Sequence, residues 1–382
     1  MEPRRAPTAW TYLPGSNRIV YQPLGVIGII SAWNYPLLVT LSPLIGALAA
    51  GNRTILKPSE IAPRTAAALA AMIAEAYPSD QVHTVNGGAD LAARFAGLPF
   101  DHIVFTGSTR VGKVIMREAS ENLTPVTLEL GGKSPAIIHE SYPLATAVNR
   151  IVGGKLLNAG QTCIAPDYVL APRARVDAFV EGALALMKRL YPKLAAGTDY
   201  TRIINGNHYH RLAGYLADAA SKGAVLHRHH PSGEACNEEN RVLAPTILTG
   251  VNDAMTVMQD EIFGPILPVI PYGSIEDAID FVNARPRPLA LYYFDNNRKR
   301  ADTILSRTCS GGVTLNGVIL HIAQNDLPFG GIGPSGMGSY HGFDGFERFS
   351  HKKAVHTQGR IAALDLFRPP YTSRIRRFID AL

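Results

Sequence analysis

The pattern that most constrains the fold is an alternation of strand-like and helix-like segments between residues 24 and 130. Residues 24–31 form a continuous apolar run, as in a parallel strand that is buried on both faces. Helical and extended patterns then follow one another without a long break. This alternation predicts a doubly wound α/β domain, in which ligands bind beyond the carboxyl ends of the strands. The predicted helices are 37–50, 63–76, 88–96 and 110–122, and the further strands are 53–57, 81–85, 102–105 and 126–130.

A second region with the same alternation begins near residue 135. Because no internal repeat or flexible linker separates the two regions, we expect them to share an interface. Ahead of both, residues 10–22 predict two short strands joined by a turn at 14–17, a ribbon of the kind that pairs with another chain. In the second region we predict strands 135–138, 168–171, 242–248, 289–294 and 311–316, and helices 144–158, 176–190, 208–221, 275–284 and 298–306.

Composition narrows the class of protein. The net charge of +6 is spread along the chain apart from basic ends, and no nucleic-acid motif accompanies it, so we expect a solvated basic surface and no nucleic-acid partner. The three cysteines are too few and too far apart for a disulfide framework or a zinc site, and they indicate a reducing compartment. No signal-peptide core and no apolar run of membrane-spanning length is present. We therefore expect a cytoplasmic protein without a metal or a membrane span.

The segment FTGSTRVGKV is the first candidate for a nucleotide site. Its Gly107 and Lys113 fit the start of a P-loop, but Val114 stands where a magnesium-binding Ser or Thr is required, which disfavours a nucleotide triphosphatase. A glycine turn that opens a helix after a strand still favours a phosphate at the helix N-terminus. The sequence has no GxGxxG, so a dinucleotide would be held in a variant manner; an ordinary strand-to-helix turn is the alternative.

Cys163 and Glu129 are the main candidates for catalysis. Cys163 follows NAG, which suggests a helix end, and its neighbours are small or polar, so an exposed nucleophile is favoured over inert packing. Glu129 lies between two leucines at the end of an apolar strand, where burial should raise its pKa and suit it to act as a general base. The alternative for Glu129 is a structural carboxylate that caps the following GGK turn.

Two further segments end strands of the first region. Asn34, in AWNYP, is either a turn residue or the amide donor for a developing oxyanion. Lys57 and Glu60, in KPSE, either bind a ligand or belong to a helix start that is capped by Ser59. Together with Glu129 and the segment 106–108, these residues could converge on one crevice.

Seven motifs follow one another along the chain: PLGVIGIISAWNYP, GNRTILKPSE, FTGSTRVGK, VTLELGGKSP, GQTCIAPDYVL, DEIFGPILPV and LPFGGIGPSGMGSYHG. In this order they identify a resemblance to the aldehyde dehydrogenase superfamily, closest to its class-3 and coniferyl aldehyde branches. The resemblance covers residues 23–353. It implies an aldehyde dehydrogenase-like α/β fold with two doubly wound α/β domains and a small β oligomerisation arm.

The resemblance implies the following roles. Cys163 would attack an aldehyde, with the oxyanion held by Asn34 and the Cys163 backbone amide, and Glu129 would activate the water that hydrolyses the thioester. The cofactor would be NAD, because an acid at position 60 disfavours the 2′-phosphate of NADP. NADP is the alternative. The implied cofactor residues are Lys57 and Glu60 at the adenosine ribose, Gly107 and Ser108 at the pyrophosphate, and Glu261 and Phe263 at the nicotinamide ribose.

The resemblance also implies a domain plan and a homodimer. Residues 1–23 would form the oligomerisation arm, 24–131 the NAD-binding domain and 132–331 the catalytic domain, while 332–382 would return to the cofactor domain, supply an oligomerisation strand and end in a basic tail. The family has a further helical N-terminal segment ahead of the stretch that begins here near Trp10, so we expect apolar surface to be exposed where that segment would lie. Ala32 and Gly317 differ from the family's usual proline and acidic residue.

The expected function is oxidation of an aromatic aldehyde, such as coniferyl aldehyde, or of a medium-chain aliphatic aldehyde to the carboxylic acid. Two alternatives remain open at this point. One is a non-catalytic protein of this fold that acts as a structural or binding subunit. The other is a thiol hydrolase that uses Cys163 and Glu129 on esters without a nucleotide.

Overall fold

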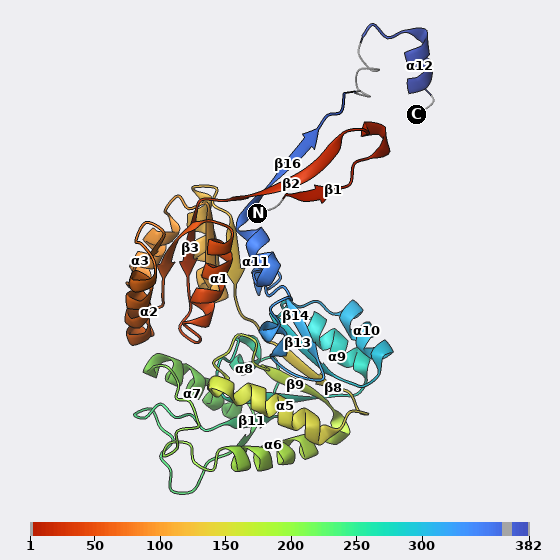
Figure 1. Ribbon diagram of the computed structural model, residues 1–382. Coiled ribbons are helices and arrows are strands. Elements are labelled where there is room, and N and C mark those ends of the chain that lie inside the picture. Colours follow the sequence, from red (N-terminus) through yellow and green to blue (C-terminus); the bar gives the residue numbers. More distant parts are fainter. Residues whose placement is uncertain (1–2, 361–368, 381–382) are drawn as a thin grey trace.

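The computed structural model describes residues 3–360 and 369–380, which form two lobes and a projecting arm (Figure 1). The first lobe is built on a sheet of strand order β15-β7-β6-β3-β4-β5, parallel except for β15. Its strands are β3 (Val26–Ile30), β4 (Arg53–Lys57), β5 (Val82–Thr84), β6 (His102–Thr106), β7 (Val126–Glu129) and β15 (Gly336–Met337), and its helices are α1 (Leu38–Ala49), α2 (Pro63–Ala76), α3 (Ala89–Ala96) and α4 (Thr109–Ser120).

The second lobe has its own sheet, of order β10-β11-β12-β9-β8-β13-β14, in which only β10 is antiparallel. Helices cover both faces, so β13 is buried along its whole length. Its strands are β8 (Pro135–Ile138), β9 (Tyr168–Pro172), β10 (Val225–Arg228), β11 (Thr246–Thr249), β12 (Ile266–Tyr272), β13 (Ala290–Phe294) and β14 (Gly312–Leu315), and its helices are α5 (Leu144–Leu156), α6 (Val176–Leu190), α7 (Gly206–Ser221), α8 (Thr256–Gln259), α9 (Ile275–Asn283) and α10 (Arg298–Arg307).

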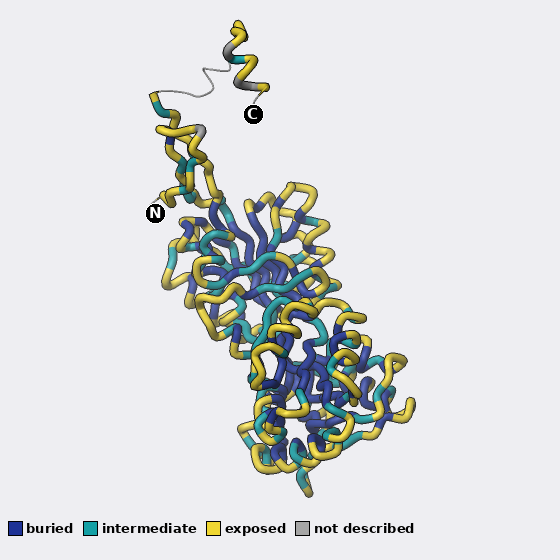
Figure 2. Tube along the Cα trace, turned by 90° about the vertical axis from the view of Figure 1, so that its right-hand side faces the viewer, coloured by how far each residue is buried: buried dark blue, intermediate teal, exposed yellow. Residues whose placement is uncertain are grey.

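These two parallel sheets confirm the predicted α/β fold. Each lobe has a buried centre of its own (Figure 2). In the first sheet the strand order reverses between β3 and β6, and in the second between β8 and β13. Such reversals leave a crevice beyond the carboxyl ends of the two strands. None of the described helices is long and apolar enough to cross a bilayer.

The arm combines both ends of the described chain. Strand β2 (Ser16–Pro23) pairs with β1 (Arg4–Ala6) on one side and with β16 (Ser350–Thr357) on the other, and the three project from the first lobe (Figure 1). The prediction of two strands within 10–22 was wrong, because residues Trp10–Tyr12 form a 3₁₀ turn. Helices α11 (Gly342–Arg348) and α12 (Ser373–Ile379) precede and follow β16. Residues 361–368 and 381–382 of the predicted tail lie outside the described residues.

Most other predicted elements match the structure within two or three residues at each end. The predicted strand 242–248 is shorter, since only β11 joins the ladder, although residues 242–245 are buried. Pro245 has no N–H to donate to a neighbouring strand. The predicted helix 144–158 ends at Leu156, because Asn158 and Ala159 adopt left-handed backbone conformations. Helix α4 begins at Thr109, with Ser108 as its N-cap.

Candidate active site

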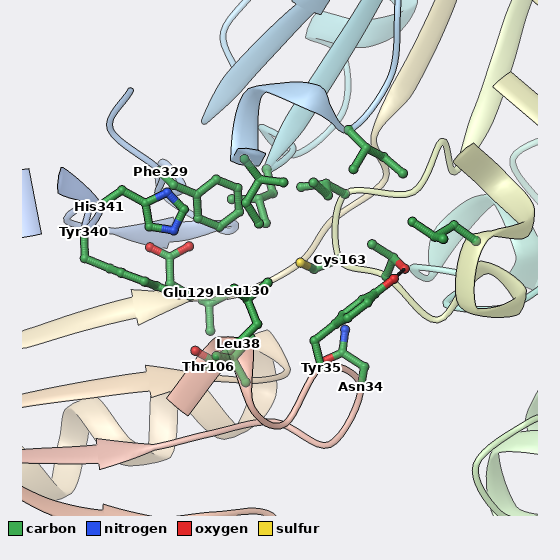
Figure 3. Close-up of a pocket in the computed structure, with 17 residues that line it drawn as sticks. Asn34, Tyr35, Leu38, Thr106, Glu129, Leu130, Cys163, Phe329, Tyr340 and His341 are labelled. Carbon is green, nitrogen blue, oxygen red and sulfur yellow. Dashed lines mark hydrogen bonds between the residues drawn. The ribbon is translucent and has the colours of Figure 1, made fainter. Parts of the chain in front are cut away.

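A mostly apolar cavity of about 200 Å³ lies where the two lobes meet (Figure 3). Strands β6 and β7 end at its wall with Thr106 and Glu129, and the segment after β3 contributes Asn34. The second lobe contributes Cys163 from the loop that leads to β9. The structure therefore brings the predicted nucleophile, base and oxyanion donor to a single cavity.

Glu129 is held in a position that disfavours its charge. It is 2% exposed, and neither of its carboxylate oxygens has a hydrogen-bond partner among the described residues. Burial raises its pKa well above the ordinary value of a glutamate. The carboxyl group lies between the Tyr340 and His341 side chains, which line the same cavity (Figure 3). A carboxylate of this kind has a high affinity for a proton and is free to accept one from a molecule in the cavity.

Cys163 reaches the cavity because the chain turns sharply just before it. Asn158 and Ala159 have φ values of 51°, and Gly160 has a φ of 75°. A Cβ atom on Gly160 would lie 2.2 Å from the carbonyl oxygen of Gly264, so only glycine fits. Burial, with the nearby carboxylates of Glu261 and Glu129, raises the pKa of Cys163 to about 12. The resting group is therefore a thiol that needs a base to become a nucleophile.

Asn34 is fastened to the Cys163 loop. The side-chain Nδ2 of Asn34 donates to the backbone carbonyl oxygen of Gln161 at 3.1 Å, and the backbone carbonyl oxygen of Asn34 accepts from Asn158 Nδ2 at 3.1 Å. The amide has a second N–H, which this bond does not use. The next residue, Tyr35, pairs its hydroxyl with Thr162 Oγ1 at 2.8 Å. The amide donor is thus fastened to the residues that come directly before the thiol in its loop.

The residues predicted for the adenosine ribose and pyrophosphate lie at other strand ends of the first sheet. Lys57 ends β4, is 2% exposed and donates to Glu60 at 2.7 Å. Burial opposes the ionisation of Glu60 and is the largest single effect, but the hydrogen bond and charge of Lys57 and a backbone hydrogen bond together outweigh it and lower the pKa of Glu60. The alternative in which Ser59 caps α2 is wrong, because Ala62 occupies the N-cap without a side-chain bond.

Gly107 and Ser108 join β6 to α4. The Ser108 hydroxyl caps this helix by accepting from the Val111 N–H at 3.4 Å. The two residues therefore lie at the start of a twelve-residue helix, beside the crevice where the strand order reverses between β3 and β6. Backbone N–H groups at such a helix start suit a phosphate, so this part of the lobe fits a dinucleotide.

Glu261 and Phe263 lie in the loop ahead of β12. Phe263 has a φ of 50°, and its ring contacts that of Trp33 at 5.4 Å between centroids. The Glu261 carboxylate packs so closely on Gly131 that a Cβ atom there would lie 2.1 Å from one of its oxygens. Burial and the neighbouring Asp167 carboxylate raise the pKa of Glu261 to about 8. None of the six residues proposed for the cofactor is among the described residues that line the cavity.

Sequence reasoning missed the aromatic part of the cavity wall. Phe329, Tyr340 and His341 close the cavity opposite Asn34 (Figure 3). Phe329 stacks on His341 with ring centroids 5.4 Å apart, and its backbone forms a bridge with Tyr340. Their only signal is that they interrupt a glycine-rich stretch. Among the described residues, no cluster of three or more His, Cys, Asp or Glu could hold a metal ion.

Comparison with known proteins gives a consistent result. The model of the family described as "Aldehyde dehydrogenase family" matches residues 7–355. A probable coniferyl aldehyde dehydrogenase of Pseudomonas aeruginosa is 52% identical over all of this chain, which covers 79% of that protein. The coniferyl aldehyde dehydrogenase of Pseudomonas sp. is 46% identical over 97% of this chain and 77% of its own length. The rat "Aldehyde dehydrogenase, dimeric NADP-preferring" is 45% identical over 87% of this chain and 72% of its own length.

Solved structures agree with the fold. The substrate-bound state of Staphylococcus aureus AldH superposes with a TM-score of 0.92 at 38% identity, covering 100% of this chain and 81% of that one. A Mycobacterium tuberculosis aldehyde dehydrogenase complexed with NAD+ has a TM-score of 0.82 at 34% identity, covering 92% of this chain and 72% of that one.

Proposed function

Because this chain belongs to the aldehyde dehydrogenase family and oxidises aldehydes to acids, we propose that Cys163, Glu129 and Asn34 carry out the reaction with NAD as the cofactor. The observation that carries this proposal is the common cavity. It holds a thiol, a buried carboxylate without a partner and a side-chain amide fastened to the thiol loop. These are the three groups that a covalent oxidation of an aldehyde requires.

Cys163 acts first. Its Sγ attacks the aldehyde carbon as the thiol proton passes to a base, and Glu129 is the unpartnered carboxylate in the same cavity. The negative charge that develops on the aldehyde oxygen is stabilised by Asn34 Nδ2 and the Cys163 backbone N–H. The thiohemiacetal carbon then loses a hydride, for which bound NAD would supply the acceptor. The product of that step is a thioester on Cys163.

Glu129 acts again in the second half of the reaction, after the proton that it took from the thiol has passed to solvent. It takes a proton from a water molecule as that water attacks the thioester carbon. The carbon–sulfur bond then breaks, the Cys163 thiol is restored and the carboxylic acid leaves. Since burial keeps the pKa of Glu129 high, the carboxylate is a strong enough base for this step.

For the cofactor we propose the residues at the strand ends of the first lobe. Lys57 and Glu60 would bind the adenosine ribose, and Gly107 and Ser108 the pyrophosphate. Glu261 and Phe263 would hold the nicotinamide ribose. The Glu60 carboxylate, kept ionised by Lys57, would repel a 2′-phosphate, which supports NAD over NADP. We accordingly propose 24–131 as the NAD-binding domain and 132–331 as the catalytic domain.

We further propose a cytoplasmic homodimer that assembles through the arm. Residues 1–23 and 332–382 supply β2 and β16, and β16 leaves one edge of the arm unpaired in the described chain. Such an edge is suited to pairing with another chain. A relative from rat carries "dimeric" in its name, which supports the dimer. The cysteines support the cytoplasm, because the free thiols Cys163, Cys236 and Cys309 suit a reducing compartment.

The proposed substrate is an aromatic aldehyde such as coniferyl aldehyde, or a medium-chain aliphatic aldehyde. The walls of the cavity support this class, because rings and aliphatic chains surround the thiol: Tyr35, Leu38, Leu157, Ile319, Phe329 and Tyr340. Relatives with about half of their residues identical carry coniferyl aldehyde in their names.

A small panel tests the substrate class: coniferyl aldehyde, hexanal and acetaldehyde, each with NAD and with NADP. Hexanal has four CH₂ groups more than acetaldehyde, and at about 0.8 kcal/mol for each buried group its kcat/KM should be about 200-fold higher. NADH formation is followed by absorbance. A preference for acetaldehyde would contradict the proposed class, and equal rates with NADP would contradict the role of Glu60.

A further inference from the structure

Three segments of the active site meet at one buried charge cluster, which the mechanism above does not use. Lys133, Lys155, Asp167 and Glu261 lie together behind the cavity. Lys133 follows Gly131 and Gly132, where the chain passes from the first lobe to the second. Asp167 follows Cys163 by four positions. The Lys133 and Asp167 side chains are only 11% and 4% exposed, and Lys155 is 1% exposed. Burying four ionisable groups raises the free energy of the fold unless their charges compensate one another. We therefore expect the cluster to have a function.

The Asp167 carboxylate divides its two oxygens between different segments. Oδ2 forms an ion pair with Lys133, and Oδ1 accepts from the backbone N–H of Ile262 at 2.9 Å. Ile262 lies between Glu261 and Phe263. One carboxylate therefore connects three segments: the loop that carries Cys163, the segment after Glu129 that carries Lys133, and the Glu261–Phe263 loop proposed to hold the nicotinamide ribose.

Lys133 reinforces the same connection. Besides Asp167, its Nζ donates to the carbonyl oxygens of Val257 at 2.8 Å and of Asp260 at 2.9 Å. All three N–H groups of this ammonium are thus used, two of them on the segment that leads into the loop. From the other side, Arg211 donates to the carbonyl oxygen of Ile262 at 2.9 Å.

The loop that these bonds hold has an unfavourable conformation. Phe263 adopts a left-handed backbone conformation, which an aromatic residue adopts only where its surroundings impose it. Lys155 lies close to Asp167 and Glu261, whose carboxyl groups favour its charge, although burial lowers the pKa of Lys155 to about 8. The bonds from Asp167, Lys133 and Arg211 therefore hold the segment that carries Glu261 and Phe263 in this conformation.

We propose that Asp167 is a positioning residue that ties the Cys163 loop to the Glu261–Phe263 loop, and so fixes the nicotinamide end of the cofactor relative to the nucleophile. The inference rests on the proposed function, because Glu261 and Phe263 act on the cofactor there. Asp167 touches neither the aldehyde nor the cofactor. Its effect is on cofactor affinity and on the alignment of the hydride transfer.

The test is Asp167→Asn, which keeps the shape and one oxygen for the Ile262 N–H but removes the charge that pairs with Lys133. Asp295→Asn is the matched control, since it also removes a buried, ion-paired carboxylate from the second lobe. Asp295 follows the carboxyl end of β13, whereas Asp167 precedes the amino end of β9. NAD binding is titrated by tryptophan fluorescence, because Trp33 contacts Phe263. Hydrolysis of 4-nitrophenyl acetate without nucleotide reports separately on the Cys163 thiol.

For Asp167→Asn we expect the dissociation constant and the KM of NAD to rise and kcat to fall by about 10-fold to 100-fold in all, the scale of a misplacement near 1 Å. The KM of the aldehyde and the nucleotide-free ester hydrolysis should stay at their wild-type values. Asp295→Asn should bind NAD normally. Wild-type NAD binding and kcat in Asp167→Asn, or an equal loss in Asp295→Asn, would overturn the proposal.

Folding and the proposed function are controlled separately. If Asp167→Asn does not fold by circular dichroism, Lys133→Gln breaks the same ion pair from the other side, and its NAD titration decides by the same criteria. If the wild-type chain binds neither NAD nor NADP, the proposed function fails. If it binds NAD and the variant binds equally well, only the role of Asp167 fails.

Discussion

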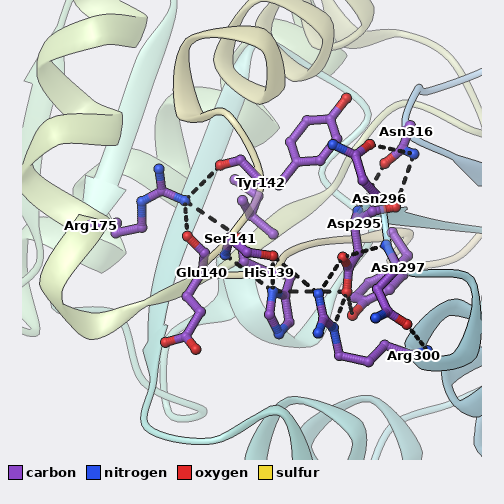
Figure 4. Close-up of polar contacts among 12 residues, drawn as sticks. His139, Glu140, Ser141, Tyr142, Arg175, Asp295, Asn296, Asn297, Arg300 and Asn316 are labelled. Carbon is purple, nitrogen blue, oxygen red and sulfur yellow. Dashed lines mark hydrogen bonds and ion pairs between the residues drawn. The ribbon is translucent and has the colours of Figure 1, made fainter.

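Two buried carboxylates, Glu129 and Asp295, show how differently the chain treats the same chemical group. Glu129 ends β7 and faces the cavity without a partner for either oxygen in the described chain. Asp295 follows the carboxyl end of β13, in the second sheet (Figure 4). It accepts from Arg300 at 2.6 and 2.8 Å, from the Asn297 N–H at 2.8 Å and from the Tyr293 hydroxyl at 2.9 Å.

The pKa values move in opposite directions as a result. Burial alone would raise both. For Asp295 the hydrogen bonds from Arg300, Asn297 and Tyr293 outweigh burial and lower the pKa to about 2. For Glu129 nothing opposes burial. A buried carboxylate that is fully paired stabilises the fold, whereas one that is left unpaired retains its affinity for a proton and is available for chemistry.

The largest effect should come from removing the atom that both catalytic steps act on. Cys163→Ala should lower NADH formation from an aldehyde by a factor of the order of 10⁶, the scale for loss of a nucleophile. Cys309→Ala, which removes an exposed thiol, is the matched control and should keep the wild-type rate. Turnover by Cys163→Ala would rule out covalent catalysis at this residue.

Glu129→Gln should have the next largest effect, since it removes the unpaired carboxylate and leaves the shape of the side chain. Deacylation should slow by about 10² to 10⁴, the usual contribution of a general base. A rapid burst of NADH followed by slow turnover, seen by stopped flow, would locate the loss after hydride transfer. An unchanged steady-state rate would remove Glu129 as the base.

The pH dependence sharpens the same prediction. The wild-type rate should rise with pH as Glu129 ionises, and Glu129→Gln should lack this rise. Because the folded-state pKa of Glu129 is raised, its favourable contribution to stability is complete below the unfolded value and is lost as the pH rises through the folded value. Thermal unfolding should therefore show the Gln variant gaining stability relative to the wild type as the pH increases.

Asp295→Asn should change stability and leave the chemistry alone. It weakens the bonds to Arg300, which is partly exposed, so we expect a loss of about 1–3 kcal/mol in the free energy of unfolding. Since the pKa of Asp295 is lowered, this loss should be complete above pH 3.8, the ordinary value, and should vanish as the pH falls through about 2. Urea titrations measure it. Reduced turnover per folded molecule would contradict the comparison.

The sequence predicted both candidate residues of the active site and the framework around them, because these depend on local patterns. A glutamate inside an apolar strand and a cysteine in a small-residue turn are visible without a structure. The contact between Tyr35 and Thr162 is not, since it joins residues 127 positions apart. The bounds of strand β16 are not visible either, although the family resemblance implies an oligomerisation strand somewhere within 332–382. Its sequence SHKKAVHT is mostly polar, and it is extended because it pairs with β2 at the other end of the chain.

The pairing of β15 with β7 has a consequence for biosynthesis. Gly336 lies opposite Glu129 in this ladder, so the strand that carries Glu129 has an unpaired edge until roughly 200 more residues have been made. At 5–20 residues per second, the ribosome needs about 10–40 s for that stretch. During this interval the first lobe is nearly complete, yet it exposes one bare strand edge, which is where unwanted association with other nascent chains would begin.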